Sequence, residues 1–485
     1  MNDLSVVVDK LVSYARKNLM LARENEICAR NAVLDALGSP EYAYTGAECR
    51  DSSPEQLLQE FTSVCEREGI FSEDEAEEYT DKVMGALTAS PQNIRRAFMW
   101  RERENSKSAT DWFYTYCVKN DYVKKSKLDK NPRFEQGGLI ITINKAKPEF
   151  RDPKKAVSGN SVKGGYPKCA ICRENEGCPV RNKRTLRTVD LALDGEKWFW
   201  QYSPYGYFHQ HGIAVNCEHT PMHVDKSTFV KLMDFVDKFP HYFIGCNAPL
   251  PRIGGSVLAH DHFQGGGEIL PMHKAGAFKV MGRADFGGTV EIVDWPGTVI
   301  RVVSRNRQQI AEMCEQIRSA WVGYTNTALG IIAEDEQGVH NAVSPTVVKT
   351  ARGYEMSLIL RSNITSAQYP DGVFHAHPEF HSIKKESIGL IEAQGLFILP
   401  GRLEGQLKNL EEIIARNEQL PAEYEPFRLV FEEAKAICAN EGVDPSAAMK
   451  KELGSVCARI LENTAVFKDK MTTVKFMQNM GFEVI

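Results

Sequence analysis

The sequence predicts an α+β protein in which helical segments flank a β-rich middle, and three observations support this prediction. Apolar residues recur at three- and four-residue spacing near both ends, which is typical of amphipathic helices. The middle contains a succession of short apolar runs that are typical of strands. All twelve histidines lie between His209 and His381, so we expect the proton and metal chemistry in the middle and structural support from the flanks.

The helical N-terminal region is expected to span residues 1–130, with its clearest helical patterns at 5–22 and 54–87. A first β-rich half is expected at 131–285, beginning with the apolar run 137–143. It also contains a helix at 227–239, and its further strand candidates are residues 198–202, 212–216, 241–246 and 256–264.

A second β-rich half is expected at residues 286–400, and a helical C-terminal region at 401–485. Helices are predicted at 307–324, where the pattern is strongly amphipathic, and at 387–394. The strand candidates of this half are residues 290–293, 298–304, 341–349 and 354–361.

Composition narrows the class of protein. The chain has 485 residues, of which 42% are hydrophobic and 25% charged, as expected for a soluble globular protein of two or three structural units. A formal charge of −5 argues against broad nucleic-acid binding. No signal-peptide pattern is recognised, and the apolar run 388–399 is too short and too polar to span a membrane. With twelve cysteines and no secretion signal, we expect a reduced, cytoplasmic protein.

The most informative segment is the glycine-flanked run at residues 254–267. Within it His260, His262 and Gln264 occupy alternate positions, which places them on one face of an extended strand. The glycines allow a group such as a phosphate to approach the backbone closely. Imidazole is a good nucleophile that is mostly neutral near pH 7. The alternatives are a hairpin with merely solvated histidines, or a pair of imidazoles that both bind a metal.

A metal site is predicted from two cysteines and two histidines. Cys169 and Cys172 form a C-x-x-C turn, and His219 and His260 follow downstream. Two thiolates and two imidazoles complete a tetrahedral set for structural zinc. Three other side chains compete for a ligand position: Cys178, Cys217 and His223. If His260 binds the metal, His262 is held beside a fixed anchor.

Several long runs resemble galactose-1-phosphate uridylyltransferases, specifically the class II bacterial branch. The matching runs are residues 166–177, 198–205, 218–222, 239–243, 254–266 and 381–392, with weaker similarity at 111–114 and 142–145. The resemblance covers most of the chain. It implies two histidine-triad-like halves, each an antiparallel sheet with helices. One difference is that this chain has His-Asp-His-x-Gln where class I members have His-Pro-His-x-Gln.

The resemblance also assigns roles to individual residues. His262 matches the nucleophile and Gln264 the amide that binds phosphate, and the metal set matches the four ligands above. The positions that match substrate-binding residues are Asn247, Gly255, Ser256 and Lys385. The spacing from Ser256 to His260 is one residue longer than in class I, and the alignment near Lys385 is approximate.

Two further expectations concern charged side chains and a second metal. In the basic run 181–187 we favour Arg187 as a phosphate contact, with a solvated surface loop as the alternative. Class I members carry a second metal in the other half. His340, His375 and His377 are candidates for it here, but the sequence offers no secure carboxylate partner, and the site stays unassigned.

The expected activity is transfer of UMP from UDP-glucose to galactose 1-phosphate through a uridylyl-histidine. The expected partners are a nucleotide sugar, a sugar phosphate and a second copy of the chain, with no nucleic acid and no membrane. One alternative is a histidine-triad nucleotide hydrolase or dinucleoside polyphosphate phosphorylase, which uses water or phosphate as the acceptor. The other is a zinc-stabilised binding module without catalysis.

Overall fold

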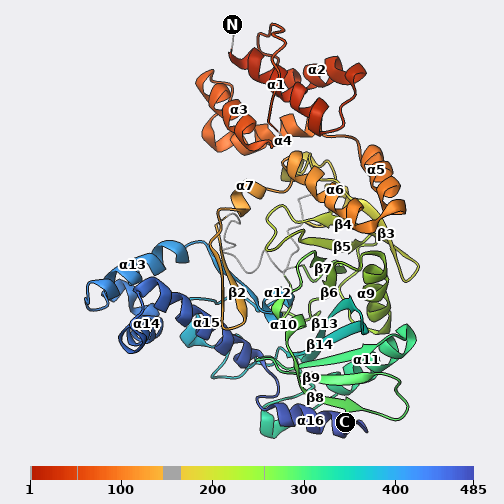
Figure 1. Cartoon of the computed structure of the whole chain (residues 1–485), viewed down its shortest axis with the longest axis vertical. Coiled ribbons are helices and arrows are strands. Elements are labelled where there is room, and N and C mark those ends of the chain that lie inside the picture. Colours follow the sequence, from red (N-terminus) through yellow and green to blue (C-terminus); the bar gives the residue numbers. More distant parts are fainter. Residues whose placement is uncertain (1–2, 52, 146–164, 256) are drawn as a thin grey trace.

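The N-terminal region is helical, as predicted. The computed structural model describes residues 3–51, 53–145, 165–255 and 257–485, and Figure 1 shows the whole chain. Helix α5 begins after Ser90, whose side chain accepts a hydrogen bond from the Asn93 N–H, and Asn105 caps α6 in the same way. The helices of this region are α1 (Asp3–Asn18), α2 (Glu26–Ala36), α3 (Glu55–Arg67), α4 (Ala76–Leu87), α5 (Pro91–Glu104), α6 (Ser106–Lys119) and α7 (Lys125–Leu128).

The centre of the molecule is one antiparallel sheet of 11 strands. Its order is β16-β8-β9-β10-β14-β13-β6-β7-β5-β4-β3. The strands of the first half are β3 (Val189–Leu193), β4 (Glu196–Tyr202), β5 (Gly212–Asn216), β6 (Phe243–Gly245) and β7 (His262–Gly266). Those of the second half are β8 (Ala277–Gly282), β9 (Thr289–Val293), β10 (Val299–Ser304), β13 (Asn341–Thr350) and β14 (Gly353–Ser362).

The two β-rich halves join edge to edge in this sheet. Strand β6 pairs with β13, with Gly245 opposite Thr346. The α+β class is therefore confirmed, and the two antiparallel halves share one continuous sheet. The division at residue 285 stays a prediction; β8 precedes it in sequence but pairs with β9.

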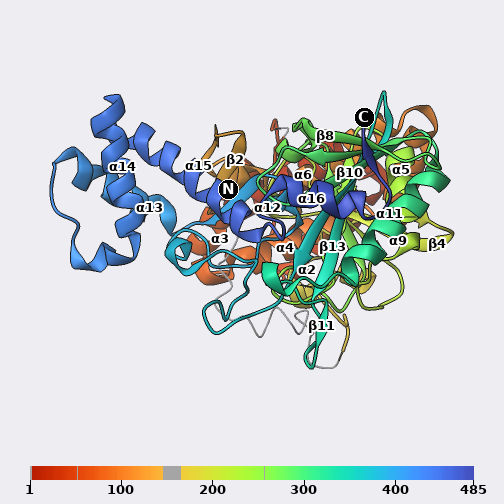
Figure 2. The same ribbon diagram turned by 90° about the horizontal axis from the view of Figure 1, so that it is seen from below.

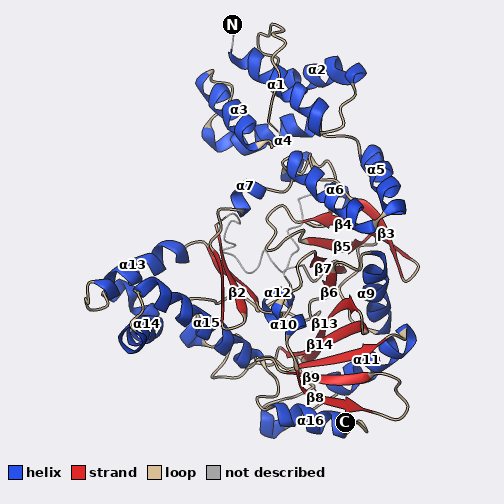
Figure 3. Cartoon of the chain, viewed as in Figure 1, coloured by secondary structure: helices blue, strands red, loops and turns tan. Residues whose placement is uncertain are grey.

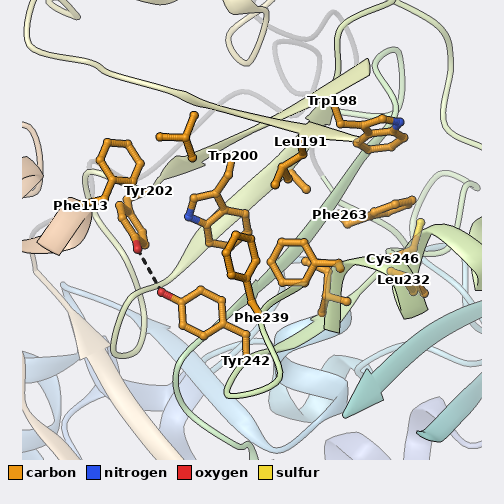
Figure 4. Packing of buried hydrophobic residues seen from close by; sticks show 14 of the residues in the cluster. Phe113, Leu191, Trp198, Trp200, Tyr202, Leu232, Phe239, Tyr242, Cys246 and Phe263 are labelled. Atoms are coloured by element: carbon orange, nitrogen blue, oxygen red, sulfur yellow. Dashed lines mark hydrogen bonds between the residues drawn. The ribbon is translucent and has the colours of Figure 1, made fainter. Parts of the chain in front are cut away.

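Helices α9 (Lys226–Lys238) and α11 (Arg307–Val322) cover one face of the sheet (Figure 3). Beneath α9 the core is aromatic, and Figure 4 shows how its side chains interlock. The Trp198 ring stacks on Phe263 at 4.6 Å, and the hydroxyls of Tyr202 and Tyr242 are hydrogen-bonded at 3.0 Å. This packing fixes which face of β7 points away from α9.

The opposite face is covered by a second, smaller sheet and two short helices. The small sheet contains β1 (Arg133–Gln136), β2 (Leu139–Asn144) and β15 (Leu396–Pro400), and β15 runs parallel to β2. The short helices are α10 (Pro271–Lys274) and α12 (Leu390–Ala393). The predicted helix at 387–394 is shorter in the structure because the Glu392 carboxylate accepts a hydrogen bond from the Gly389 N–H, which starts the helix there.

The C-terminal region is helical, as predicted, apart from the last strand. Helices α13 (Leu403–Ala415) and α14 (Arg428–Glu441) stand away from the main sheet, as Figure 2 shows from below. Helix α15 (Pro445–Thr464) packs on β1 and β2, and α16 (Lys470–Gln478) packs on β9. Strand β16 (Glu483–Val484) pairs with β8 and ends the sheet. In the described part of the chain, no helix combines the length and apolar character needed to cross a bilayer.

Candidate active site

Strand β7 carries the proposed catalytic pair on one face. It pairs with β5, where Val215 lies opposite His262 and Ile213 opposite Gln264. Phe263, between the two, points to the opposite face and stacks in the aromatic core (Figure 4). Because side chains alternate along a strand, His262 and Gln264 both point away from α9. His260 lies in the turn before β7, so the predicted single face holds for His262 and Gln264 only.

The His262 ring is buried and held in one orientation. Its Nδ1 lies 2.8 Å from the backbone oxygen of His260. A carbonyl oxygen only accepts, so Nδ1 carries the proton and Nε2 keeps its lone pair. Among the described residues, Nε2 has no hydrogen-bond partner. Burial lowers the pKa of His262 below its ordinary value, which favours the neutral ring. This is the state a nitrogen nucleophile needs.

Glycines permit close packing around this strand. A Cβ on Gly265 would lie 2.1 Å from the backbone oxygen of Phe243 in β6, and one on Gly212 would lie 2.4 Å from the Trp200 ring. Any larger residue would push neighbouring strands apart. Gly265 therefore permits the close approach of β6 to β7, and Gly212 leaves room for the Trp200 ring of β4.

The four predicted metal ligands gather in one cluster. Their ligand atoms all lie within 4.8 Å of one another, and no other such group occurs in the described part of the chain. Cys169 Sγ lies 3.3 Å from Cys172 Sγ and 3.3 Å from Nδ1 of His260, and Cys172 Sγ lies 3.2 Å from Nδ1 of His219. Tetrahedral zinc, with bonds of about 2.1–2.3 Å, requires ligand spacings of about 3.3–3.8 Å. The donor set and its spacing fit zinc.

Neighbouring groups orient these ligands. The Nε2–H of His260 donates to the backbone oxygen of Asn216 at 2.9 Å, which leaves Nδ1 free for a metal. The Asn175 amide donates to the backbone oxygens of Cys169 and Cys172 at 2.9 and 2.8 Å. Hydrogen bonding from Cys172 lowers the pKa of the Cys169 thiol, and the same contact raises the pKa of Cys172, so the pair shares its first negative charge at Cys169.

The three rival ligands do not join this cluster. Cys217 Sγ accepts from the Arg173 guanidinium at 3.7 Å, and His223 faces Asp225 at 3.8 Å. Cys178 is buried outside the group. The candidates for a second metal do not form a ligand group in the described part of the chain. His340 faces Asp335 at 2.9 Å, and His375 Nδ1 faces the backbone oxygen of Ala376. The His377 ring stacks on Tyr369.

The loop between β6 and β7 links the two halves. Asn247 is buried, and its Oδ1 accepts from the backbone N–H of Leu390 at 2.9 Å. Its Nδ2 has no hydrogen-bond partner in the described part of the chain. A Cβ on Gly255 would lie 2.8 Å from this Nδ2, so the loop backbone approaches the amide closely. Ser256 lies outside the described residues.

Lys385 and Arg187 have different surroundings. The Lys385 side chain is exposed, whereas neighbouring Lys384 is buried and ion-paired with Glu392 at 2.5 Å. Arg187 is also buried, so the solvated-loop alternative does not describe it. Its Nε donates to the backbone oxygen of Ala89 at 2.7 Å and its Nη1 to that of Leu186 at 2.7 Å. These bonds tie the N-terminal helices to the sheet, and they favour a structural role for Arg187 over a phosphate contact.

Comparisons with known sequences identify the family. The N-terminal domain of galactose-1-phosphate uridyl transferases matches residues 22–221, and the C-terminal domain matches residues 206–424. The chain belongs to this family. Galactose-1-phosphate uridylyltransferases of Bifidobacterium longum subsp. longum and Halalkalibacterium halodurans are 51% and 35% identical to it, over 98% and 96% of this chain and 97% and 96% of theirs.

Solved structures give a weaker comparison. Yeast Ap4A phosphorylase Apa2 in complex with AMP is 12% identical to this uridylyltransferase-family chain, with a TM-score of 0.36, over 65% of this chain and 91% of the other. The family assignment rests on the sequence comparisons alone.

Two contributors to the site escaped the sequence analysis of this family member. The Asn216 backbone oxygen orients His260, and no side-chain pattern signals a carbonyl. Asn175 follows the C-x-x-C turn by three residues, and this position in the sequence was the available signal for its contacts with both cysteine carbonyls.

Proposed function

We propose that this chain transfers UMP from UDP-glucose to galactose 1-phosphate, giving UDP-galactose and glucose 1-phosphate, in galactose metabolism. Relatives of this name match nearly the full length of the chain. The observation that carries the proposal is the His262 ring, whose Nδ1 is fixed at 2.8 Å from a carbonyl while Nε2 remains available.

The reaction is a double displacement. Nε2 of His262 attacks the α-phosphorus of UDP-glucose, a nitrogen–phosphorus bond forms, and glucose 1-phosphate leaves with the electrons of the broken phosphorus–oxygen bond. A phosphate oxygen of galactose 1-phosphate then attacks the same phosphorus, and the nitrogen–phosphorus bond breaks. A sugar phosphate is a stable anion, so its departure needs little protonation. Catalysis therefore depends on placement and on charge stabilisation.

Other residues of the chain support these steps. The Gln264 amide donates to a phosphoryl oxygen without introducing a titrating group. The Asn247 Nδ2 and the backbone near Gly255 offer further donors, with Ser256 and Lys385 proposed as additional substrate contacts. Zinc, when bound by the Cys169 cluster, supplies a rigid anchor for the turn that precedes His262. We further propose that the protein is a cytoplasmic homodimer; none of its twelve cysteines forms a disulfide.

The deciding experiment is incubation of the protein with UDP-glucose alone, followed by mass spectrometry. A gain of one uridylyl mass, mapped to the peptide that contains His262, is expected. The His262→Ala variant should gain none and retain its zinc, whereas the matched His223→Ala variant should behave as the native chain, because His223 lies outside the cluster. Absence of the adduct on the native protein would contradict a stable uridylyl-histidine and leave the nucleotide hydrolase and the binding module as alternatives.

Label exchange separates the remaining alternatives. A uridylyltransferase moves label between glucose 1-phosphate and UDP-glucose, because the first half-reaction is reversible. A nucleotide hydrolase releases UMP and shows no such exchange. A phosphorylase would consume inorganic phosphate as the acceptor in place of a sugar phosphate. Release of UMP or UDP in these assays, without exchange, would contradict the proposed acceptor.

A further inference from the structure

Arg361 is a buried cation with unused hydrogen-bonding capacity. It lies near the end of β14 and is 1% exposed. Its Nη2 donates to the backbone oxygen of Ile388 at 2.8 Å. Its Nε and Nη1 have no hydrogen-bond partner among the described residues. Burying a guanidinium with two unpaired N–H donors destabilises the folded state unless another group accepts hydrogen bonds from them.

The strand register places Arg361 on the same sheet face as Gln264. Across the sheet, Gln264 lies opposite Gly245, Gly245 opposite Thr346, and Thr346 opposite Ser357. Arg361 follows Ser357 by four residues in β14, and residues separated by an even number share a face. Three strand spacings, about 14 Å, separate β7 from β14, and Arg361 lies four residues, about 13 Å, along β14 from the position in register with Gln264. The arginine side chain spans part of that distance.

Two loops bring Arg361 next to the substrate-binding loop of the first half. Its partner across the β13–β14 pair is Ala342, which packs with Ala248 and Ile253 of that loop. On the other side, the Ile388 oxygen accepts from Arg361, and two residues later the Leu390 N–H donates to Asn247. Arg361 and the partnerless Nδ2 of Asn247 therefore flank the same short segment, Ile388 to Leu390.

The charges around Arg361 do not neutralise it. Glu392 is the carboxylate whose charge raises the pKa of Arg361. It is already paired with Lys384 at 2.5 Å, however, and the exposed Glu386 also faces Lys384, at 3.6 Å. The other ionisable neighbour is His375, whose pKa is lowered by burial and by Arg361. Burial lowers the pKa of Arg361 to about 10, so it stays charged at neutral pH. Among the described residues, both carboxylates are thus paired with Lys384 and none is ion-paired with Arg361.

We propose that Arg361 binds the phosphate of the hexose 1-phosphate, which is the leaving group of the first half-reaction and the attacking group of the second. The inference rests on the proposed function. A guanidinium offers a fork of donors that matches phosphate oxygens, which a lysine does not provide. In this arrangement His262 of the first half takes the uridylyl group while Arg361 of the second half holds the sugar phosphate.

The test is the affinity of glucose 1-phosphate for the full-length, zinc-loaded protein, measured by calorimetry, with UMP as a second probe. Arg361→Gln should weaken glucose 1-phosphate binding about 10- to 100-fold, as expected for loss of a charge-assisted contact, and leave UMP binding within about twofold. Arg361→Lys keeps the charge but loses the fork, and should weaken glucose 1-phosphate several-fold. If Arg361→Gln does not fold, the glucose 1-phosphate affinity of Arg361→Lys tests the proposal.

The matched control is Arg301→Gln. Arg301 is a buried arginine of β10 on the same face, but it is paired with Glu291 at 3.2 Å and donates to the backbone oxygen of Met272 at 2.9 Å. Its replacement should lower the urea midpoint without changing the ratio of glucose 1-phosphate affinity to UMP affinity.

The outcomes distinguish the two proposals. Native protein that forms the uridylyl adduct, together with an Arg361 variant that binds glucose 1-phosphate as tightly as native, overturns the role of Arg361 only. Equal weakening of UMP and glucose 1-phosphate, as a general structural defect would give, also overturns it. Native protein that forms no adduct overturns the proposed function itself.

Discussion

Nδ1 of His262 donates to the backbone oxygen of His260 at 2.8 Å, so a candidate metal ligand orients the proposed nucleophile through its main chain. The His260 ring is itself fixed, with Nδ1 3.3 Å from Cys169 Sγ and Nε2 bonded to Asn216. The two histidines thus present opposite ring nitrogens, Nδ1 of His260 to the candidate metal site and Nε2 of His262 to the proposed phosphorus atom. A change in the metal site should consequently reach the nucleophile.

Cys172→Ser tests this connection. Loss of one thiolate should remove stoichiometric zinc and destabilise the fold by about 4 kcal/mol or more, which is the range for losing a metal site. The His260 carbonyl would lose its fixed position, so the rate of uridylyl adduct formation should fall by more than tenfold. Zinc content by atomic emission, the urea midpoint and the adduct rate measure the three effects.

Cys178→Ser is the matched control for this prediction. Cys178 is also buried, but it is not one of the four clustered ligands. It should keep one zinc per chain and its adduct rate. A Cys172→Ser protein that retained zinc, or a Cys178→Ser protein that lost it, would show that the ligand set is wrongly assigned.

Gln264→Glu should slow uridylyl transfer strongly. The substitution preserves shape but replaces a hydrogen-bond donor with a carboxylate that repels the phosphate. Removing one donor from a developing oxyanion costs about 10²–10³ in rate, and the added charge increases the loss. Single-turnover rates with UDP-glucose measure it. Gln264→Ala, which only removes the donor, should lie between native and Gln264→Glu; a Gln264→Glu rate close to native would remove Gln264 from the phosphate site.

Three of the four clustered residues, Cys169, Cys172 and His260, could be selected from sequence because each belongs to a local pattern. A C-x-x-C turn and alternating histidines indicate their chemistry from neighbouring positions alone. Strand β7 was predicted to begin near residue 256 but begins at His262, because His260 turns toward Cys169 and leaves the extended path. A local pattern therefore pointed to residues that cluster in the fold but did not give the exact start of the strand.

The joining of the halves was not predictable in the same way. The β6–β13 pairing connects residues about a hundred positions apart, and β2 pairs with β15 at still greater separation. No local periodicity encodes which edges meet. For the same reason Arg361 was not selected, since its interest comes from Ile388 and Asn247, which lie far from it in sequence. The sequence offered one indication of a special role for Arg361, namely that it is a charged residue within the apolar run of β14.

The stability of the fold should decrease in mild acid partly because of His273. Its Nε2–H donates to the Gln394 oxygen at 2.7 Å, and burial, followed by Arg301, lowers its pKa to about 4. A histidine with a lowered folded pKa binds protons more readily when unfolded, so stability falls as pH drops below about 6.5. Between pH 7.5 and 5.5 this one residue should cost about 1.4 kcal/mol.

His273→Gln isolates that contribution. Glutamine keeps a neutral donor and does not titrate, so the difference in unfolding free energy between pH 7.5 and 5.5 should shrink by roughly 1.4 kcal/mol relative to the native chain. Urea unfolding at both pH values measures it, and the remaining pH dependence comes from the other histidines. An unchanged pH dependence would mean that His273 is accessible to protons in the folded state.

Gly265→Ala should damage both the fold and the activity. The added methyl would meet the Phe243 backbone oxygen at 2.1 Å, and a backbone atom within a sheet cannot move aside as a flexible side chain does. Overpacking of this kind costs about 1–3 kcal/mol, and relief by separating β6 from β7 would displace the neighbouring Gln264. The urea midpoint should fall, and adduct formation should slow even under conditions where the protein is fully folded.

Gly276→Ala is the control, because a Cβ there has no neighbour within 4 Å, and its stability should stay within about 0.5 kcal/mol of native. If Gly265→Ala matched Gly276→Ala in both measurements, close contact between β6 and β7 could not be what places Gln264 beside His262.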